Sequence, residues 1–373
     1  MNGIKILAMA AAIGCGATLT SCLEDDVNTI LIDPDDPAQS GGLRPGGGDD
    51  DGTGKPGTGK PVSYDLRFFM AELRNRATGE WPRLLGTGNS HRNAWVEIDG
   101  KDALVEFVNP GDAGAATLKA DIALLVDNSE SMEEENDAIA DGLAAWTRKL
   151  ADGGVDARYA VVGHSEEGTI NGATDFSTAE NLEIFFNYKH GSDRTSHFGG
   201  TGSDRLEEAA TRYPRLNTEC CMLALRFADE HLSFREGAER VYINFTDEPN
   251  QPYGNHEYSI DWLTDHWHST MGEVHTVYSA PEPSPSEYTP LYNEPARSLS
   301  DRTGGTLTYT DERFSNVSLA DLEFCESLIH GYIARLKNVA PYIDGKRHRV
   351  VIRVNDADGR AHSKAMGVIF KVQ

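Results

Sequence analysis

The chain has 373 residues, of which 59 are acidic and 34 are basic, and its formal net charge is −25. This excess of negative charge argues against a nucleic-acid-binding protein and against direct docking on an anionic lipid surface. The roughly 310 residues that follow a polar amino-terminal segment are enough for one large domain or two of modest size.

Residues 1–21 are typical of a bacterial signal peptide. The apolar stretch 6–13 follows Lys5 and is too short to span a bilayer as a helix. It leads to Leu-Thr-Ser-Cys, which resembles a bacterial lipobox, and this resemblance implies cleavage before Cys22 and a lipid on its sulfur. The alternative is an ordinary secretory signal with a chance cysteine. Because a lipid anchors a protein without making it span, we expect a cell-envelope lipoprotein at the outer membrane or cell surface.

Residues 22–62 are predicted to form a flexible acidic tether. The segment is rich in Gly, Pro and Asp, and its end, GGGDDDGTGKPGTGKP, offers no apolar side chains to bury. Such a composition cannot offset the conformational entropy lost on ordering, so the chain should stay extended and solvated here.

The segments 63–117 and 339–373 flank the centre of the chain and are both β-rich. Apolar and polar residues alternate with period two in 64–73, 91–109, 344–361 and 364–373, as in strands with one buried face. Neither flank has enough strands to bury a face by itself. We therefore expect the two flanks to pair into one small β-sandwich with the middle of the chain inserted. The alternative is that each flank packs separately on the central domain.

The middle of the chain, 118–338, alternates strands and helices. The apolar run 121–126 precedes a helical stripe, and this order repeats toward the carboxyl end. The pattern predicts an α/β fold with a doubly wound, mainly parallel sheet covered on both faces. Expected strands are 158–164, 240–247, 273–280 and 305–310; expected helices are 132–150, 203–213, 219–232, 260–271 and 318–336; the segment 181–189 fits either type. The stripe of the last helix would contain Leu322, Cys325, Ile329, Tyr332, Ile333 and Leu336.

Three cysteines remain in the mature chain besides Cys22. In an oxidising compartment, one disulfide and one free thiol among Cys220, Cys221 and Cys325 is the simplest expectation, and the sequence leaves the pairing open.

A cluster of oxygen-bearing side chains interrupts this pattern where two strands end. The run 122–126 ends in Asp127-Asn128-Ser129-Glu130-Ser131, and the run 240–245 ends in Thr246-Asp247. In a parallel sheet, ligands bind beyond the carboxyl ends of the strands. Carboxylates and hydroxyls are oxygen donors of the kind that hard divalent cations take, so a metal site is predicted at this edge.

These motifs resemble the von Willebrand factor A (vWA) family over roughly 118–338. The metal-ion-dependent adhesion site of that family is Asp-x-Ser-x-Ser, a later Thr in a Gly-rich loop, and an Asp after a hydrophobic strand. Asp127, Ser129, Ser131 and Asp247 match it, and Thr201 in FGGTGS is in the right order. The resemblance implies that the two serines and the threonine bind Mg²⁺ (or Mn²⁺ or Ca²⁺) directly, with the aspartates often acting through water.

The same resemblance implies adhesion or complex assembly, with an acidic residue of a partner protein completing the metal shell. We expect no enzymatic activity, because no general base is recognisable beside the cluster. Three alternatives stay open. The first is a scaffold of a cell-envelope apparatus that uses metal only for rigidity, and the second is a metal-assisted hydrolase. The third is a vWA fold that has lost its metal and keeps the serines as helix caps.

Overall fold

The computed structural model describes residues 45–46, 63–110, 112, 118–165, 167–187, 203–267, 271–279, 288, 292–311, 313–315, 318–368 and 370. The predicted signal peptide, the lipidation site Cys22, almost all of the tether and Thr201 lie outside these ranges. None of the helices within them is both long and apolar enough to cross a membrane.

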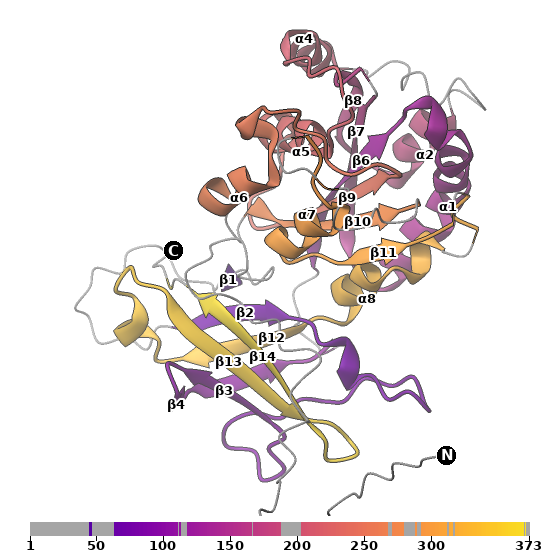
Figure 1. Ribbon diagram of the computed structural model, residues 1–373. Coiled ribbons are helices and arrows are strands. Elements are labelled where there is room, and N and C mark those ends of the chain that lie inside the picture. The colour runs from indigo at the N-terminus through magenta and orange to yellow at the C-terminus, as the bar shows by residue number, and fades with distance from the viewer. Residues whose placement is uncertain are drawn as a thin grey trace, which may run out of the picture.

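A six-stranded sheet forms the centre of the larger part of the molecule (Figure 1). Its strand order is β11-β10-β9-β6-β7-β8, and every neighbouring pair is parallel except β7 with β8. The predicted α/β class with a mainly parallel sheet is confirmed. The strands are β6 (Lys119–Asp127), β7 (Asp156–His164), β8 (Ile170–Ser177), β9 (Glu239–Thr246), β10 (Glu273–Tyr278) and β11 (Leu307–Tyr309).

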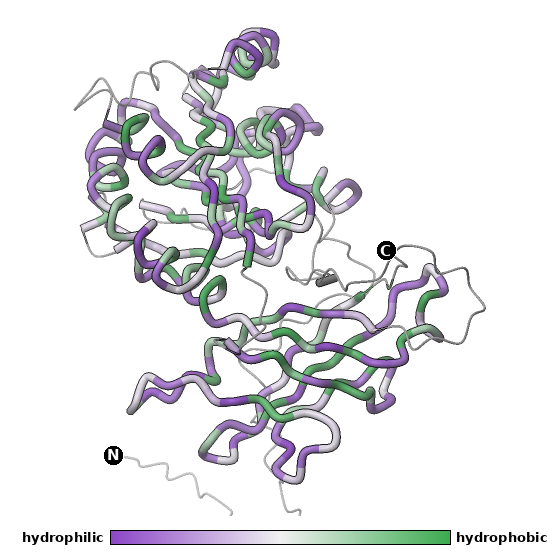
Figure 2. Tube along the Cα trace, turned by 180° about the vertical axis from the view of Figure 1, so that it is seen from behind, coloured by the Kyte–Doolittle hydropathy of each residue, from purple (hydrophilic) through white to green (hydrophobic). Residues whose placement is uncertain are grey.

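Helices cover both faces of this sheet, which is why the central strand β6 is apolar from Ile122 to Val126. On one face, α1, α2 and α8 pack on Ile122, Leu124 and Val126; on the other, α4 to α7 pack around Ala123 and Leu125. Hydrophobic residues follow the central strands, and hydrophilic ones predominate on the outer helix α4 (Figure 2). The helices are α1 (Glu133–Asp152), α2 (Ala179–Asn187), α4 (Asp204–Arg212), α5 (Cys221–His231), α6 (Ile260–His266), α7 (Ala296–Thr303) and α8 (Glu323–His330).

The three cysteines of this part are free and buried, so the expected disulfide is wrong. Cys325 belongs to the core on the α1 face of the sheet, where Trp146 Nε1 donates a hydrogen bond to its sulfur at 3.0 Å. Cys220 and Cys221 lie in the core on the opposite face. The sheet between the two cores keeps Cys325 from pairing with either of them.

Two four-stranded antiparallel sheets form a β-sandwich from the two ends of the described chain. One sheet is β1-β2-β12-β5 and the other is β14-β13-β3-β4, and their facing residues make one core. The predicted sandwich with an inserted α/β part is confirmed. Its strands are β1 (Pro45–Gly46), β2 (Ser63–Phe68), β3 (Ala94–Ile98), β4 (Lys101–Asp102), β5 (Leu104–Val108), β12 (Tyr332–Lys337), β13 (His348–Asn355) and β14 (Ala361–Val368).

The helix expected over 318–336 is corrected, because α8 ends at His330 and the chain continues as β12. Burial alternates along β12, with Tyr332, Ala334 and Leu336 buried in the sandwich. Arg67 of β2 donates hydrogen bonds to the Ser327 and Leu328 carbonyls at 2.6 and 2.8 Å, which satisfies the end of α8. A side chain at Gly331 would collide with this guanidinium, so a glycine stands at the junction. The α/β part therefore ends before β12, earlier than the boundary expected at 338.

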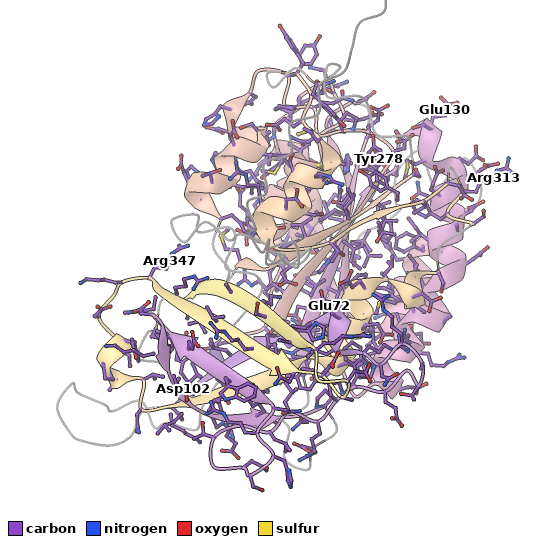
Figure 3. All side chains as sticks on the ribbon, turned by 60° about the horizontal axis from the view of Figure 1, so that its bottom comes forward. Glu72, Asp102, Glu130, Tyr278, Arg313 and Arg347 are labelled. Atoms are coloured by element: carbon purple, nitrogen blue, oxygen red, sulfur yellow. The ribbon has the colours of Figure 1, made fainter. Side chains whose placement is uncertain are left out.

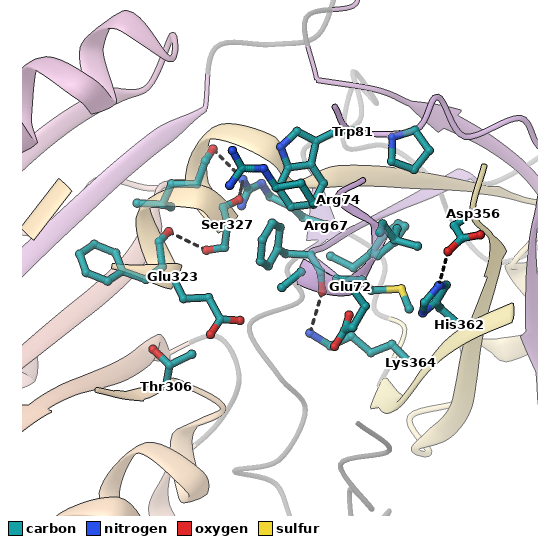
Figure 4. Close-up of a pocket in the computed structure, with 18 of the residues that line it drawn as sticks. Arg67, Glu72, Arg74, Trp81, Thr306, Glu323, Ser327, Asp356, His362 and Lys364 are labelled. Atoms are coloured by element: carbon teal, nitrogen blue, oxygen red, sulfur yellow. Dashed lines mark hydrogen bonds and ion pairs between the residues drawn. The ribbon is translucent and has the colours of Figure 1, made fainter. Parts of the chain in front are cut away.

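The sandwich lies at the edge of the central sheet where the strands begin. A cavity of about 920 Å³ separates the two parts there, lined by Arg67 and Lys364 from the sandwich and by Glu273 and Thr306 from the α/β part (Figure 4). Trp81 of the sandwich stacks on His330 with ring centroids 5.1 Å apart. The opposite edge, where the strands end, is left uncovered by the sandwich.

Deletion of residues 346–373 should unfold the amino-terminal flank and spare the central sheet. The deletion removes Val350, Ile352 and Val354, which are fully buried in the shared core and each contribute roughly 1.5–3 kcal/mol on burial. Hydrogen exchange should show lost protection in β3, which pairs with β13, and retained protection in β6. The control Arg353→Ala, at an exposed position of the same strand, should leave both unchanged. Full protection of β3 in the truncated protein would mean that the flanks fold independently.

Candidate metal centre

The predicted cluster lies at the carboxyl edge of the sheet, where β6 and β9 end side by side. The parallel register Val126↔Phe245 brings Asp127 next to Thr246, and Asp247 follows directly. Asp127 is fully buried, although a carboxylate is rarely buried without partners. The fold thus brings together two acidic side chains that are far apart in the sequence.

Hydrogen bonds hold the Asp127 carboxylate in one orientation. The Ser129 backbone N–H donates to Oδ1 at 3.1 Å, and the Thr246 hydroxyl donates to Oδ2 at 2.9 Å. The Asn136 side chain of α1 donates to the Asp127 carbonyl at 3.3 Å, which ties the strand end to the helix. These contacts position the carboxylate before any ligand binds.

The two serines of the motif present their hydroxyls to the same point. Ser129 is extended and begins the short 3₁₀ turn Glu130–Met132, which turns Ser131 back toward it. Their Oγ atoms are 3.0 Å apart. Ser129 is buried and Ser131 is exposed, so the pair reaches from the interior to the solvent.

Asp247 supplies the observation that tests whether a cation fits. Its Oδ1 is buried and has no hydrogen-bond partner. Burial and the nearby charge of Asp127 raise the pKa of Asp247, and a hydrogen bond from Ser131 partly offsets this. A divalent cation would neutralise the repulsion between the two carboxylates and satisfy the orphaned oxygen, so the residues present fit such an ion.

Among the described residues, no group of three or more His, Cys, Asp and Glu side chains is arranged to hold a metal. A cation at this edge would therefore depend on the hydroxyl groups as well as on the two carboxylates, as the vWA motif implies. The structure brings Asp127, Ser129, Ser131 and Asp247 together. The placement of Thr201, the fifth residue of the predicted set, lies outside the described ranges.

A layer of buried polar atoms below the cluster was missed in the sequence. Both ring nitrogens of His164, at the end of β7, lack a hydrogen-bond partner, as do Nδ2 of Asn128 and Oδ1 of Asn136. Burial lowers the pKa of His164, so the ring stays neutral. Such groups are usually satisfied by ordered water or a bound ion. The only sequence signal was a polar residue where the apolar pattern of each element predicts a core position.

Glu135 of α1 is a second residue that the sequence did not single out. It is buried, and burial raises its pKa to about 7, with smaller contributions from Asp247 and Glu134. The Ser279 hydroxyl, just after β10, donates to its Oε1 at 2.9 Å. Its carboxyl group thus faces the protein interior between α1 and the end of β10.

Acidic side chains border the exposed side of the cluster. Glu130 is exposed at the start of α1, and Glu134 pairs with Arg313 at 2.7 Å. Figure 3 shows Glu130 and Arg313 near each other at the end of the molecule away from Asp102 and Arg347 of the sandwich. Glu248 follows Asp247, and burial together with the charges of Asp247 and Asp127 raises its pKa. The surroundings of the site are therefore strongly negative.

Comparisons with known proteins give distant structural similarities. The chain is similar to BatB, a conserved hypothetical protein from Bacteroides thetaiotaomicron (15% identity, TM-score 0.32, 57% of this chain and 98% of that one). It is also similar to an aerotolerance-related membrane protein from Bacteroides fragilis (13%, 0.31, 55% and 100%) and to manganese-loaded TRAP from Plasmodium vivax (14%, 0.31, 71% and 97%). No protein-family model and no curated protein sequence matches the chain. Similarities this distant assign no function.

Glu135→Gln should stabilise the metal-free protein at pH 8 and have no effect at pH 4. Because the folded-state pKa is raised to about 7 from 4.5, wild-type stability is complete at low pH and falls as the pH rises through about 7. Glutamine keeps the Ser279 hydrogen bond and has no charge to bury. Urea denaturation in chelator should show a gain of roughly 3 kcal/mol at pH 8. The exposed control Glu130→Gln should show none, and an equal effect of Glu135→Gln at both pH values would contradict the assignment.

Proposed function

We propose that this protein is a lipid-anchored cell-envelope protein that binds a partner protein through a divalent cation. The observation that carries the proposal is the convergence of Asp127, Ser129, Ser131 and Asp247 at the open edge of the sheet, with one buried Asp247 oxygen left without a partner. Thr201 belongs to the proposed ligand set through its match to the vWA motif. Mg²⁺ is the expected ion, and Mn²⁺ or Ca²⁺ offers the same chemistry.

The donor set explains why a partner would be needed. A bound cation supplies an electrophilic centre that prefers about six oxygen ligands. Two carboxylates and a few neutral hydroxyls leave that shell incomplete and only just neutralise the ion. A carboxylate from another protein is the ligand that best completes it. This reasoning, together with the vWA resemblance, supports adhesion or complex assembly.

Binding is favoured over metal-assisted hydrolysis by the burial of the candidate bases. Glu135 has a pKa suited to proton transfer, but its carboxyl group faces the interior. His164 is neutral and is also buried. A general base has to reach a substrate or a water molecule at the metal, and neither side chain is accessible for that. A scaffold that uses metal only for rigidity is the remaining alternative, and only a metal-dependent partner separates it from adhesion.

The position of the sandwich suits an anchored binding protein. The predicted tether reaches the sandwich at β1, and the sandwich lies at the edge where the strands of the central sheet begin. The candidate metal centre is at the opposite edge. A lipid on Cys22 would therefore hold the sandwich nearer the membrane and direct the metal edge outward.

The first test is titration of the purified protein with MgCl₂ or MnCl₂ by calorimetry. One site is expected, and Asp127→Ala should abolish it because the buried carboxylate is lost. Ser131→Ala, at an exposed hydroxyl, should weaken binding at least about tenfold without harming the fold. Ser165→Ala is the matched control, since Ser165 follows β7 at the same edge and bonds Thr169 instead. Equal binding by wild type and Asp127→Ala would rule out this metal site.

The second test concerns the anchor. Cys22→Ser should prevent lipid attachment, and the protein should then leave the membrane fraction, because no described helix is able to hold it there. Fractionation of detergent-free extracts measures this, with Cys325→Ser as a control that leaves the predicted lipobox intact. A Cys22→Ser protein that stays with the membranes would show that the anchor lies elsewhere.

A further inference from the structure

Two tyrosines form an exposed aromatic pair on the loops that leave the carboxyl edge of the sheet. Tyr253 is 66% exposed and Tyr292 is 50% exposed, and their rings meet edge to face with centroids 5.2 Å apart. The aromatic clusters of the cores bury rings of this size, whereas here both rings keep at least half of their surface in water. Exposed tyrosines are prominent among the residues that dominate protein–protein binding.

Tyr253 is held in a backbone conformation that does not suit it. Its φ is +49° and that of Gly254 is +85°, and the Asn255 N–H donates to the Pro252 carbonyl at 2.9 Å, which describes a type I′ turn. Gly, Asn or Asp is usual at this position, because the left-handed backbone conformation strains other side chains. The packing of the fold does not require the ring, because most of it is in solvent. The strain therefore points to a role for the exposed tyrosine itself.

The turn is fixed rigidly to the loop of the candidate metal centre. Asn250 and Glu294 exchange backbone hydrogen bonds at 3.0 and 2.7 Å, which joins the loop after β9 to the segment that carries Tyr292. The Asn250 side chain is fully buried, and its Oδ1 accepts from the Met222 N–H at 3.1 Å at the start of α5. Both rings are thus presented by backbone that has little freedom to move.

The tyrosines are close enough to the metal centre to belong to the same interface. Tyr253 follows Asp247 by six residues, which limits their separation to about 20 Å even for an extended chain. Gln251 donates to Glu248 at 3.2 Å within this stretch, so the loop is not fully extended outward. A standard protein interface of roughly 800 Å² per partner spans such a distance.

We propose that the Tyr253–Tyr292 pair and the metal centre form one docking surface for a peptide segment that carries arginine or lysine beside the carboxylate that reaches the cation. The choice of a cationic segment follows from charge. Glu130, Glu133 and Glu134 precede or begin α1 beside the serines, and Glu248 adjoins Asp247. The faces of exposed tyrosine rings attract guanidinium and ammonium groups. The carboxylate part of this inference rests on the proposed function, whereas the cationic and aromatic part does not.

The test is selection of a phage-displayed library of random dodecapeptides on the full-length protein in MgCl₂, with elution first by chelator and then by acid. The eluted sequences should combine an acidic residue with arginine or lysine. As synthetic peptides they should bind Tyr253→Gly and Tyr292→Ser at least about tenfold more weakly than wild type, by fluorescence polarisation. Because glycine suits a φ of +49°, Tyr253→Gly should be at least as stable as wild type. Leu104→Ser, at an exposed apolar position on the sandwich, is the control and should bind normally.

The outcomes separate the two proposals. Metal-dependent peptides that bind wild type and Tyr253→Gly equally overturn the tyrosine surface and leave the proposed function standing. Acidic peptides without enrichment of basic residues overturn the cationic partner. Some peptides could bind equally well in chelator and to Asp127→Ala but fail to bind Tyr253→Gly. This result supports the tyrosine surface and overturns the metal-dependent function. A selection that yields no binding peptide in either eluate overturns both proposals.

Discussion

A sheet that is buried on both faces favours apolar side chains along its strands and polar ones where the strands end, and this constraint shapes much of the α/β part. Along β6 every side chain from Ile122 to Val126 contacts one of two apolar cores. The first residue free of that requirement is Asp127. Its burial is tolerated because the Ser129 N–H and the Thr246 hydroxyl donate hydrogen bonds to it. The candidate metal centre is thus a consequence of how the sheet is covered.

The sandwich depends on pairing between strands that are distant in the sequence. β12 pairs with β2 and β5, and β13 pairs with β3, so each sheet contains strands from before and after the α/β part. Where the chain passes from α8 into β12, Arg67 of the sandwich donates hydrogen bonds to two carbonyl groups at the end of the helix. This arrangement places the sandwich at one edge of the central sheet and leaves the other edge open. The separation of the sandwich from the open edge of the sheet follows from this topology.

The open edge of the sheet has a rigid framework, and a buried polar atom there lacks a hydrogen-bond partner. Asn250 binds together the loop after β9, the start of α5 and the segment before α7, so the exposed tyrosines and Asp247 are carried by one fixed framework. Within that framework the structure leaves an orphaned Asp247 oxygen and a strained, exposed Tyr253. Both features cost stability, whereas the hydrogen bonds of the surrounding framework are formed. This combination is the pattern expected of a binding site.

The sequence by itself determined the local elements and most of the candidate site. Period-two and period-3.6 patterns located nearly all of the elements. Asp127, Ser129, Ser131 and Asp247 were recognisable because they match the Asp-x-Ser-x-Ser motif and the later Asp of the vWA family where two apolar runs end. The edge strand β8 and helix α7 were not anticipated, because β8 is rich in polar residues and the pattern of α7 is short. Only the tertiary structure decided the end of α8 at Gly331, since Tyr332, Ile333 and Leu336 fit a helical stripe as well as a strand until Arg67 and the sandwich core are in place. It also kept Cys325 apart from Cys220 and Cys221 by placing the sheet between them. The raised pKa of Glu135 and the pairing of Tyr253 with Tyr292 depend on groups distant in the chain, and burial and contact between such groups exist only once the chain has folded.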